Sequence, residues 1–239
     1  MPPEAGPSEA GPSDGPLGVV VPALDSAAGL GRCLDALGEA GSLVGEIVVA
    51  DGGSRDATRA VARRHGARVV DAPSGRGAQL AAGAALVTAP WLLFLHADTR
   101  LAPGWQTVAR RFIADPGNAA RAGTFRFALD DDAPAARRLE AIVAWRSRAL
   151  ALPYGDQGLL LARTFYDALG GFRPLLLMED VDMVRRIGRA RLALLDAAAV
   201  TSAERYRRAG YLRRSARNLA CLGLYFAGLP TRAIARLYG

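Results

Sequence analysis

The sequence predicts a single α/β domain built on a doubly wound, mostly parallel β-sheet. Three observations indicate this fold. At 239 residues with 51% hydrophobic content, the chain can bury one substantial core and falls within the size range of a single domain. From Leu17 onward, short apolar runs alternate with longer helical patterns. Polar residues follow several of these runs, at the strand ends where such sheets bind ligands.

The first half of the chain reads as four strands separated by three helices. Runs rich in β-branched and apolar residues predict the strands Leu17–Val21, Glu46–Ala50, Ala67–Val70 and Trp91–Leu95. Apolar residues at three- and four-residue spacing predict the helices Ala27–Glu39, Arg55–His65 and Gly77–Val87. This βαβαβαβ order predicts parallel strands whose carboxyl ends converge on one crevice.

The second half is less regular. Its expected elements are a strand at Gly123–Leu129, a helix at Ala135–Leu150, a buried run at Gly158–Ala162 and a helix at Glu179–Arg189. A short β segment is expected next. An arginine-rich amphipathic helix follows at about Tyr211–Ala227, with a final helical turn at Thr231–Tyr238.

The composition of the chain indicates where the protein is located in the cell and which kinds of partner it can bind. Residues 1–16 are nearly all Pro, Gly, Ala, Ser and acidic residues, so we expect a disordered tail without a secretory signal, and a cytoplasmic protein. Cys33 and Cys221 have no disulfide or metal-ligand spacing. The net charge of +7 comes from arginine alone, a bias that codon composition explains. The apolar run Leu219–Pro230 is too short to span a bilayer.

The most informative segment is the buried strand ending in His96-Ala97-Asp98-Thr99. Its position resembles the DxD motif of family 2 glycosyltransferases, in which a carboxylate coordinates Mg²⁺ or Mn²⁺ on the donor's diphosphate. The resemblance implies that Asp98 is a metal ligand and that Ala97 lies on the nucleotide side. His96 replaces the first Asp of the motif, and imidazole tolerates Mn²⁺ better than Mg²⁺. The alternative is an Asp that only caps a turn.

Two further loops resemble nucleotide-binding elements of the same family. The segment Asp51-Gly52-Gly53-Ser54-Arg55-Asp56-Ala57-Thr58 resembles DxGSxDxT, which implies that Asp51, beside Gly52, contacts the uracil and ribose side of the donor. Val20-Val21-Pro22-Ala23-Leu24-Asp25-Ser26 resembles the P-x-x-N-E opening, with Asp25 and Ser26 in place of Asn-Glu. It implies that Pro22 and Ala23 pack beside the base and that Asp25 meets the nucleoside.

The small residues that follow the third strand suit an anion. Gly75 and Arg76 lead into the helix Gly77–Val87, whose N-terminus can approach the diphosphate. A dinucleotide-binding motif does not fit, because Leu80 occupies the place of its third glycine. The alternative is a glycine turn with a solvated arginine.

The segment Gly170-Gly171-Phe172, followed by Glu179 and Asp180, resembles the family's GGF…ED element. An inverting transferase needs a carboxylate to deprotonate the acceptor, and a helix N-terminus holds such a group rigidly. Asp180 is the expected base and Glu179 the alternative, because successive helical residues point about 100° apart.

Tyr154-Gly155-Asp156-Gln157-Gly158 resembles a GDQ element of short bacterial members, including the branch labelled radical-SAM/selenodomain-associated transferase 2. Polar groups there suit acceptor or sugar hydroxyls, which assigns Gly155, Asp156 and Gln157 to that site. A plain turn explains the segment almost equally well.

Together the motifs cover about Leu17 to Tyr238 and imply the GT-A nucleotide-diphospho-sugar transferase fold. The implied division is a nucleotide-binding half at 17–100, an acceptor and catalytic half at 101–205 and C-terminal helices at 206–239. The implied function is metal-dependent, inverting transfer of a sugar from a nucleotide-sugar, expected to be a UDP-sugar, to an unknown acceptor hydroxyl.

Two other functions compete with this interpretation. A nucleotidyltransferase would share the sheet and a metal aspartate, but it should carry a basic glycine-rich loop after the first strand. An arginine-rich module that binds a membrane or nucleic acid would explain the charge but not the acidic strand ends, so no nucleic acid is expected. The arginines of the C-terminal helix form a solvated face or a peripheral contact with anionic lipid.

Overall fold

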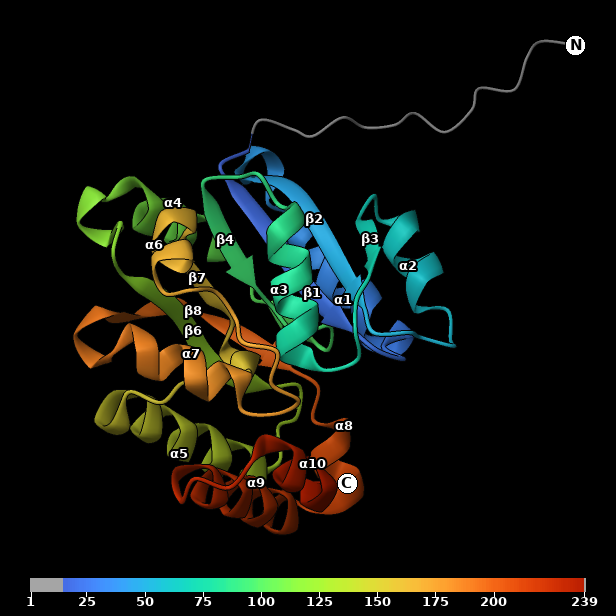
Figure 1. Ribbon diagram of the computed structural model, residues 1–239, viewed down its shortest axis with the longest axis vertical. Helices are drawn as coiled ribbons and strands as arrows, with labels where there is room; N and C mark the ends of the chain where they lie inside the picture. Colours follow the sequence, from blue (N-terminus) through green and yellow to red (C-terminus); the bar gives the residue numbers. More distant parts are fainter. Residues whose placement is uncertain (1–14, 239) are drawn as a thin grey trace, which may run out of the picture.

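A computed structural model describes residues 15–238 of the chain, and within them all strands join one sheet (Figure 1). Its eight strands lie in the order β3-β2-β1-β4-β7-β6-β8-β5. The single-domain α/β fold predicted from the sequence is confirmed. The predicted disorder of residues 1–16 falls almost entirely outside the described residues.

The first half forms the parallel part of the sheet. Its strands are β1 (Leu17–Ala23), β2 (Val44–Asp51), β3 (Arg68–Asp71) and β4 (Trp91–Phe94). The helices between them are α1 (Ala27–Gly38), α2 (Thr58–Arg64) and α3 (Arg76–Leu86). β1 pairs in parallel with both β2 and β4, and β2 pairs in parallel with β3. The predicted βαβαβαβ order is therefore confirmed here.

The second half makes the sheet mixed. Its strands are β5 (Thr99–Leu101), β6 (Ala122–Leu129), β7 (Leu159–Ala162) and β8 (Leu192–Thr201). β7 runs antiparallel to both β4 and β6, and β5 runs antiparallel to β8. Among the strands of this half, only β6 and β8 pair in parallel with each other. Parallel pairing is thus continuous only from β3 to β4.

Seven further helices surround this half. They are α4 (Trp105–Ala114), α5 (Pro134–Leu150), α6 (Arg163–Ala168), α7 (Glu179–Ile187), α8 (Glu204–Ala209), α9 (Tyr211–Phe226) and α10 (Thr231–Tyr238). Short 3₁₀ helices lie at Gly41–Leu43, Pro116–Asn118, Gly155–Gln157 and Arg189–Arg191. The sequence patterns predicted α5, α7, α9 and α10 but not α4, α6 or α8.

The core lies on both faces of the sheet. Successive residues of β1 point to opposite faces, so Val19 and Val21 pack with α1 and α4 while Val20 packs with α3. At Gly83 of α3, an added Cβ would lie 2.4 Å from Cγ1 of Val20. This helix can therefore approach the sheet closely only because it has glycine there.

The C-terminal helices close one side of the molecule. Cys221 and Leu222 of α9 and Ile234 of α10 form a small core with Met178 and Val181 at the start of α7. In Figure 1 these helices lie together below the sheet, beside α5. None of the helices in the described part of the chain has the length and apolarity that crossing a bilayer would require.

Candidate active site

A cleft lies at the carboxyl ends of the parallel strands, where the loops after β1 and β4 face the start of α3. Most of the residues that the motifs assign to the nucleotide line this cleft. They are Pro22, Ala23, Asp25, Gly75, Arg76 and Ala97. The structure therefore brings together three loops that are separated by up to 75 positions in the sequence.

The loop after β1 is held by the loop after β2. Asp25 has a left-handed backbone with φ of 46°. Its N–H donates to Ser54 Oγ at 3.0 Å, and its Oδ1 accepts the N–H of Arg55 at 2.8 Å. The N–H of Ser26 donates to Thr58 Oγ1 at 2.7 Å. These bonds offset the strain at Asp25 and fix its carboxyl group at the cleft.

Asp51 and Gly52 do not line the cleft. Asp51 is 1% exposed, and its Oδ2 accepts N–H bonds from Gly53 and Ser54 at 3.3 and 3.1 Å. A Cβ at Gly52 would lie 2.9 Å from Nε2 of Gln79, whose amide ties α3 to the carbonyl groups of Ala23 and Ala50. In this structure the pair shapes the turn that supports the cleft.

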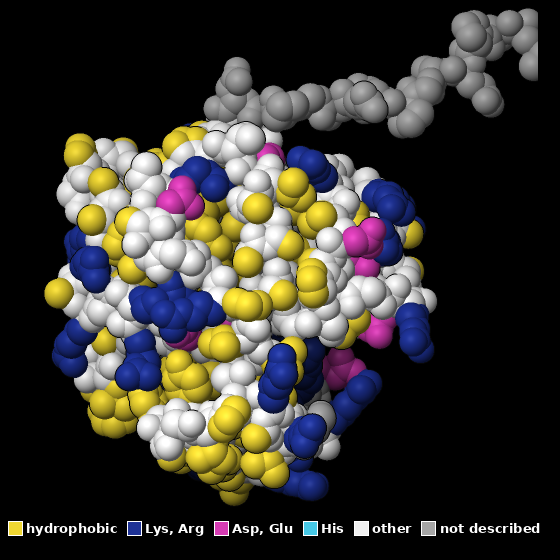
Figure 2. Space-filling view, in the orientation of Figure 1, with side chains coloured by type: hydrophobic (Ala, Val, Ile, Leu, Met, Phe, Trp, Pro, Cys, Tyr) yellow, Lys and Arg dark blue, Asp and Glu magenta, His cyan; other side chains and the backbone are white. Residues whose placement is uncertain are grey.

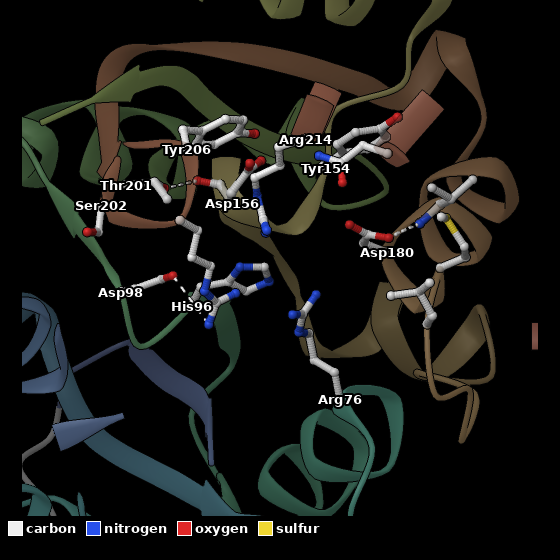
Figure 3. A pocket seen from close by; sticks show the side chains of 15 residues that line it. Arg76, His96, Asp98, Tyr154, Asp156, Asp180, Thr201, Ser202, Tyr206 and Arg214 are labelled. Atoms are coloured by element: carbon white, nitrogen blue, oxygen red, sulfur yellow. Dashed lines mark hydrogen bonds and ion pairs between the residues drawn. The ribbon is translucent and has the colours of Figure 1, made fainter. Parts of the chain in front are cut away.

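Asp98 sits where β4 leads into β5, and β8 holds this turn in place. The N–H of Ser202 donates to the Asp98 carbonyl at 3.0 Å, and the hydroxyls of Thr99 and Thr201 are 2.7 Å apart. The Asp98 side chain, labelled in Figure 3, is 29% exposed, and its Oδ2 lies 3.9 Å from Nη2 of Arg205. The backbone at Asp98 is therefore held in place, and its carboxylate is accessible from the cleft.

His96 lies beside Asp98 and faces the same space (Figure 3). Burial holds the pKa of its imidazole well below 6.5, and the positive charges of Arg76 and Arg205 lower it further. The ring is thus neutral and keeps a lone pair that can bind a metal.

These two residues fit a divalent cation that arrives with a ligand. In residues 15–238, no group of three or more His, Cys, Asp or Glu side chains could hold a metal ion by itself. A carboxylate and a neutral imidazole supply two ligands, and Mg²⁺ or Mn²⁺ commonly completes its shell with substrate phosphates and water. The donor set therefore suits a cation bound together with a diphosphate.

A second cavity adjoins the cleft (Figure 3). The two spaces share five lining residues: Arg76, His96, Asp98, Ser202 and Arg205. On its far side, the second cavity is lined by Tyr154, Asp156 and Asp180, and by Arg214 and Asn218 of α9. A ligand that spans both spaces must therefore pass Arg76, His96 and Asp98.

Asp180 is the carboxylate of α7 that reaches the second cavity. Met178, with φ of 65°, precedes the helix in a left-handed conformation that sets the direction of the first turn. Asp180 Oδ2 accepts the N–H of Gly155 at 2.7 Å, and Oδ1 accepts the N–H of Val181 at 2.7 Å. Both oxygens are thereby oriented by backbone donors.

Glu179 points elsewhere, into the interior under α3. Its side chain is fully buried, and Oε1 lies 3.3 Å from Nη1 of Arg76. Oε2 has no hydrogen-bond partner among the described residues. Burial raises the pKa of this carboxyl group to about 7; Asp180 adds to the rise, and Arg76 opposes it.

The 3₁₀ helix Gly155–Gln157 divides between the cavity and the core. Asp156 lines the cavity, and burial raises its pKa to about 6 despite the opposing charge of Arg146. Gln157 is 1% exposed; its amide donates to the Phe125 carbonyl at 3.0 Å and accepts from Ser147 Oγ at 2.9 Å. Gln157 therefore holds the segment in place rather than lining the cavity.

Gly155 packs closely against the side chains of His96 and Asp180. A Cβ there would lie 2.5 Å from His96 Nε2 and 3.5 Å from Asp180 Oδ2. The position thus requires glycine for His96 and Asp180 to keep their places.

Sequence reasoning missed the contribution of the chain from the end of β8 onward. Thr201, which ends β8, and Ser202 after it lie at the cavity, and four side chains of the following helices also line it: Arg205, Tyr206, Arg214 and Asn218. The available signal was the polar pair Thr201-Ser202 after an apolar segment. For these arginines the sequence pattern predicts only a solvated or lipid-facing surface.

Comparison with known proteins agrees with this geometry. Residues 18–175 match the Glycosyl transferase family 2 pattern. Glucosyl-3-phosphoglycerate synthase from Mycobacterium tuberculosis, solved with Mn²⁺, uridine diphosphate and glucosyl-3-phosphoglycerate, is similar in structure with a TM-score of 0.56. That similarity comes with 22% identity and covers 81% of this chain and 71% of the synthase.

Two other solved structures share the fold. The mannosyltransferase PcManGT from Pyrobaculum calidifontis, solved with GDP-Man and Mn²⁺, has a TM-score of 0.62 and 19% identity over 92% of this chain and 64% of that one. TarS from S. aureus has a TM-score of 0.61 and 15% identity, and the match covers 92% of this chain and 42% of TarS. The present chain thus spans only part of each. No curated protein sequence matches significantly.

Proposed function

The chain belongs to glycosyl transferase family 2, and from that premise we propose that it transfers a sugar from a UDP-sugar to an acceptor hydroxyl with inversion at the anomeric carbon. One observation carries the proposal. The cleft that contains Pro22, Asp25 and Arg76 opens into a second cavity that contains Asp180, and the two meet at Asp98 and His96.

In this proposal the cleft binds the nucleotide. Pro22 and Ala23 lie against the base, and Asp25 accepts a hydrogen bond from it. One oxygen of Asp25 already accepts the Arg55 amide. Asp25 is therefore better matched to the single imide N–H of uracil than to the paired donors of guanine. Arg76 turns from Glu179 to the diphosphate, where its guanidinium pairs with phosphate oxygens.

Asp98 and His96 would hold a divalent cation on the diphosphate. Bound there, Mn²⁺ or Mg²⁺ supplies positive charge that stabilises the departing nucleoside diphosphate. Asp51 and Gly52 support this site by shaping the turn beneath the cleft.

Asp180 acts as the general base. Its carboxylate takes the proton of the acceptor hydroxyl as that oxygen bonds to the anomeric carbon. The bond between the anomeric carbon and the diphosphate oxygen breaks at the same time, on the opposite face of that carbon. The diphosphate leaves with the electron pair. Asp156 and the Gly155 loop bind hydroxyls of the acceptor or of the transferred sugar. Glu179 is buried and serves to position Arg76.

A donor screen tests this function. Thermal shift with UDP-, GDP- and dTDP-sugars, each with and without Mn²⁺, should show the largest stabilisation for a UDP-sugar with the metal. NMR of the anomeric proton during turnover should then show inverted configuration. Stabilisation by GDP- or dTDP-sugars alone would reject the UDP assignment, and retained configuration would reject the proposed role of Asp180.

A further inference from the structure

The outward face of α9 is apolar although it is exposed. Leu212 is 88% exposed, Leu219 68% and Phe226 49%. These residues recur at seven-residue spacing, with exposed Ala216 and Gly223 between them, so they form one stripe along the helix. Exposed apolar residues scattered singly are ordinary, but a continuous stripe marks a surface that contacts something.

Neighbouring helices extend this surface. α10 exposes Leu237, and α5, which contacts α9, exposes Ile142 and Trp145. Figure 2 shows hydrophobic side chains and arginines close together over the lower part of the molecule, where Figure 1 places α5, α9 and α10. Bulky apolar side chains next to arginines are the composition of helices that lie in a lipid interface.

Positive charge gathers in the same segment of the chain, although Arg207 and Arg208 pair with Asp131 and Glu204 and Arg214 lines the second cavity. Residues 206–239 contain seven arginines and no acidic residue, which equals the net charge of +7 of the whole chain. Codon bias explains arginine in place of lysine, but it does not explain the absence of Asp and Glu from this segment. Arg213 of α9 and Arg232 and Arg236 of α10 are exposed. This face therefore suits an anionic partner.

We propose that α9 and α10 dock the protein on the surface of an anionic lipid bilayer. The stripe Leu212, Leu219 and Phe226 enters the boundary between headgroups and acyl chains, and the arginines pair with lipid phosphates. A second copy of the chain fits this face poorly, because the exposed Arg213, Arg232 and Arg236 of each copy would repel those of the other.

The contact would also place the candidate active site near the lipid. The inward face of α9 carries Arg214 and Asn218, which line the second cavity. One helix thus connects the proposed lipid surface with the space proposed for the acceptor. The docking surface itself does not depend on the proposed reaction, so it is tested without an activity measurement.

The test is co-sedimentation of the full chain with two kinds of vesicle, phosphatidylcholine alone and phosphatidylcholine with about one-third phosphatidylserine. We expect sedimentation with the anionic vesicles and much less with the neutral ones. The double variant Leu212→Ser/Leu219→Ser should lower the partition coefficient at least about tenfold. Arg213→Ser and Arg236→Ser should each lower it about fivefold.

Matched controls separate lipid binding through α9 and α10 from general effects of charge and folding. Arg63→Ser/Arg64→Ser removes two exposed arginines from α2 and should bind as the wild type does. Circular dichroism should show all variants folded, because every substituted side chain is exposed. Failure of the wild type to sediment with anionic vesicles, or unchanged binding of the leucine variant, overturns the proposal. Dimerisation through the leucines without vesicle binding overturns it as well.

Discussion

Arg76 and Glu179 join the two halves of the site across 103 positions of the chain. The Arg76 side chain is 35% exposed at the cleft, and its Nη1 lies 3.3 Å from Oε1 of Glu179, whose side chain is fully buried. Arg76 begins α3 and Glu179 begins α7, so the pair links the helix that faces the proposed diphosphate with the helix that carries Asp180. Any ligand that attracts Arg76 must compete with Glu179.

Arg76→Ala should weaken UDP binding while sparing uridine, because the guanidinium is proposed to pair with phosphate oxygens rather than with the base. Loss of a charge-assisted hydrogen bond typically costs about 1.5–3 kcal/mol, or roughly tenfold or more in affinity. Calorimetric titration with both ligands measures this. Comparable losses for uridine and UDP would show that Arg76 acts through the fold instead.

Glu179 should make the protein less stable as the pH rises from about 4.5 to about 7. Its folded pKa of about 7 is raised above the usual 4.5. In this window the unfolded state has lost the proton that the folded state retains, so stability falls with pH and then levels off. Glu179→Gln should flatten that part of the curve, so that the stability of the variant relative to the wild type rises by on the order of 1–3 kcal/mol between pH 4 and pH 8.

Chemical denaturation at several pH values checks the Glu179 prediction. Asp156, with a folded pKa of about 6, contributes a slope of the same sign and remains in the variant. The difference in unfolding free energy between the wild type and Glu179→Gln, plotted against pH, isolates the contribution of Glu179. A difference that stays constant from pH 4 to pH 8 would mean that the folded and unfolded pKa values of Glu179 are the same.

Asp98→Ala should remove the metal dependence of UDP binding, because Asp98 is a partly exposed carboxylate at the junction of the two spaces. Calorimetry with and without Mn²⁺ provides the measurement. Asp71→Ala, which removes an exposed carboxylate at the end of β3, is the matched control and should keep the dependence. Equal UDP affinity of the wild type with and without Mn²⁺ would reject the role of Asp98.

The βαβ half of the fold was predictable because β1, β4 and the second half of β2 are buried, largely apolar runs. β5 was missed because it has only three residues, and α4 because its buried positions are few: Trp105, Ala109 and Phe112. β8 was expected only as a short segment. It is rich in alanine, which has low strand propensity, and its length depends on pairing with both β6 and β5.

The motifs located the candidate site but did not fix the direction of each side chain. Sequence spacing left Glu179 and Asp180 as alternatives, and the left-handed backbone at Met178 now directs Asp180 to the cavity and Glu179 inward. Gln157 had the same motif support as Asp156, yet its bonds to Phe125 and Ser147 turn it into the core. Such differences depend on long-range packing, which a short motif does not contain.

Gly155→Ala should impair turnover far more than folding. The added Cβ would lie 2.5 Å from His96 Nε2, so His96 or the loop that orients Asp180 must move. Misplacement by about 1 Å can cost up to about 10²-fold in rate. Gly38→Ala in α1, where a Cβ meets nothing within 4 Å, should keep full activity. Unchanged turnover in Gly155→Ala would show that this close packing does not matter for the reaction.

Asp180→Asn should nearly abolish sugar transfer and leave UDP-sugar affinity close to that of the wild type. The amide keeps the shape of the carboxylate but cannot take up the acceptor's proton, and loss of a general base typically costs about 10²–10⁴-fold in rate. Single-turnover rates and donor affinity, measured on the same preparations, separate chemistry from binding.

Two variants complete the test of Asp180. Glu179→Gln should retain transfer, because that side chain is buried beside Arg76, and Asp156→Asn should raise KM more than it lowers kcat if Asp156 binds hydroxyls. An inactive Glu179→Gln with an active Asp180→Asn would exchange the roles of the neighbours. If Asp156→Asn alone lost the chemical step, the base would lie in the Gly155–Gln157 segment; if all three variants stayed active, none of these carboxylates would be the base.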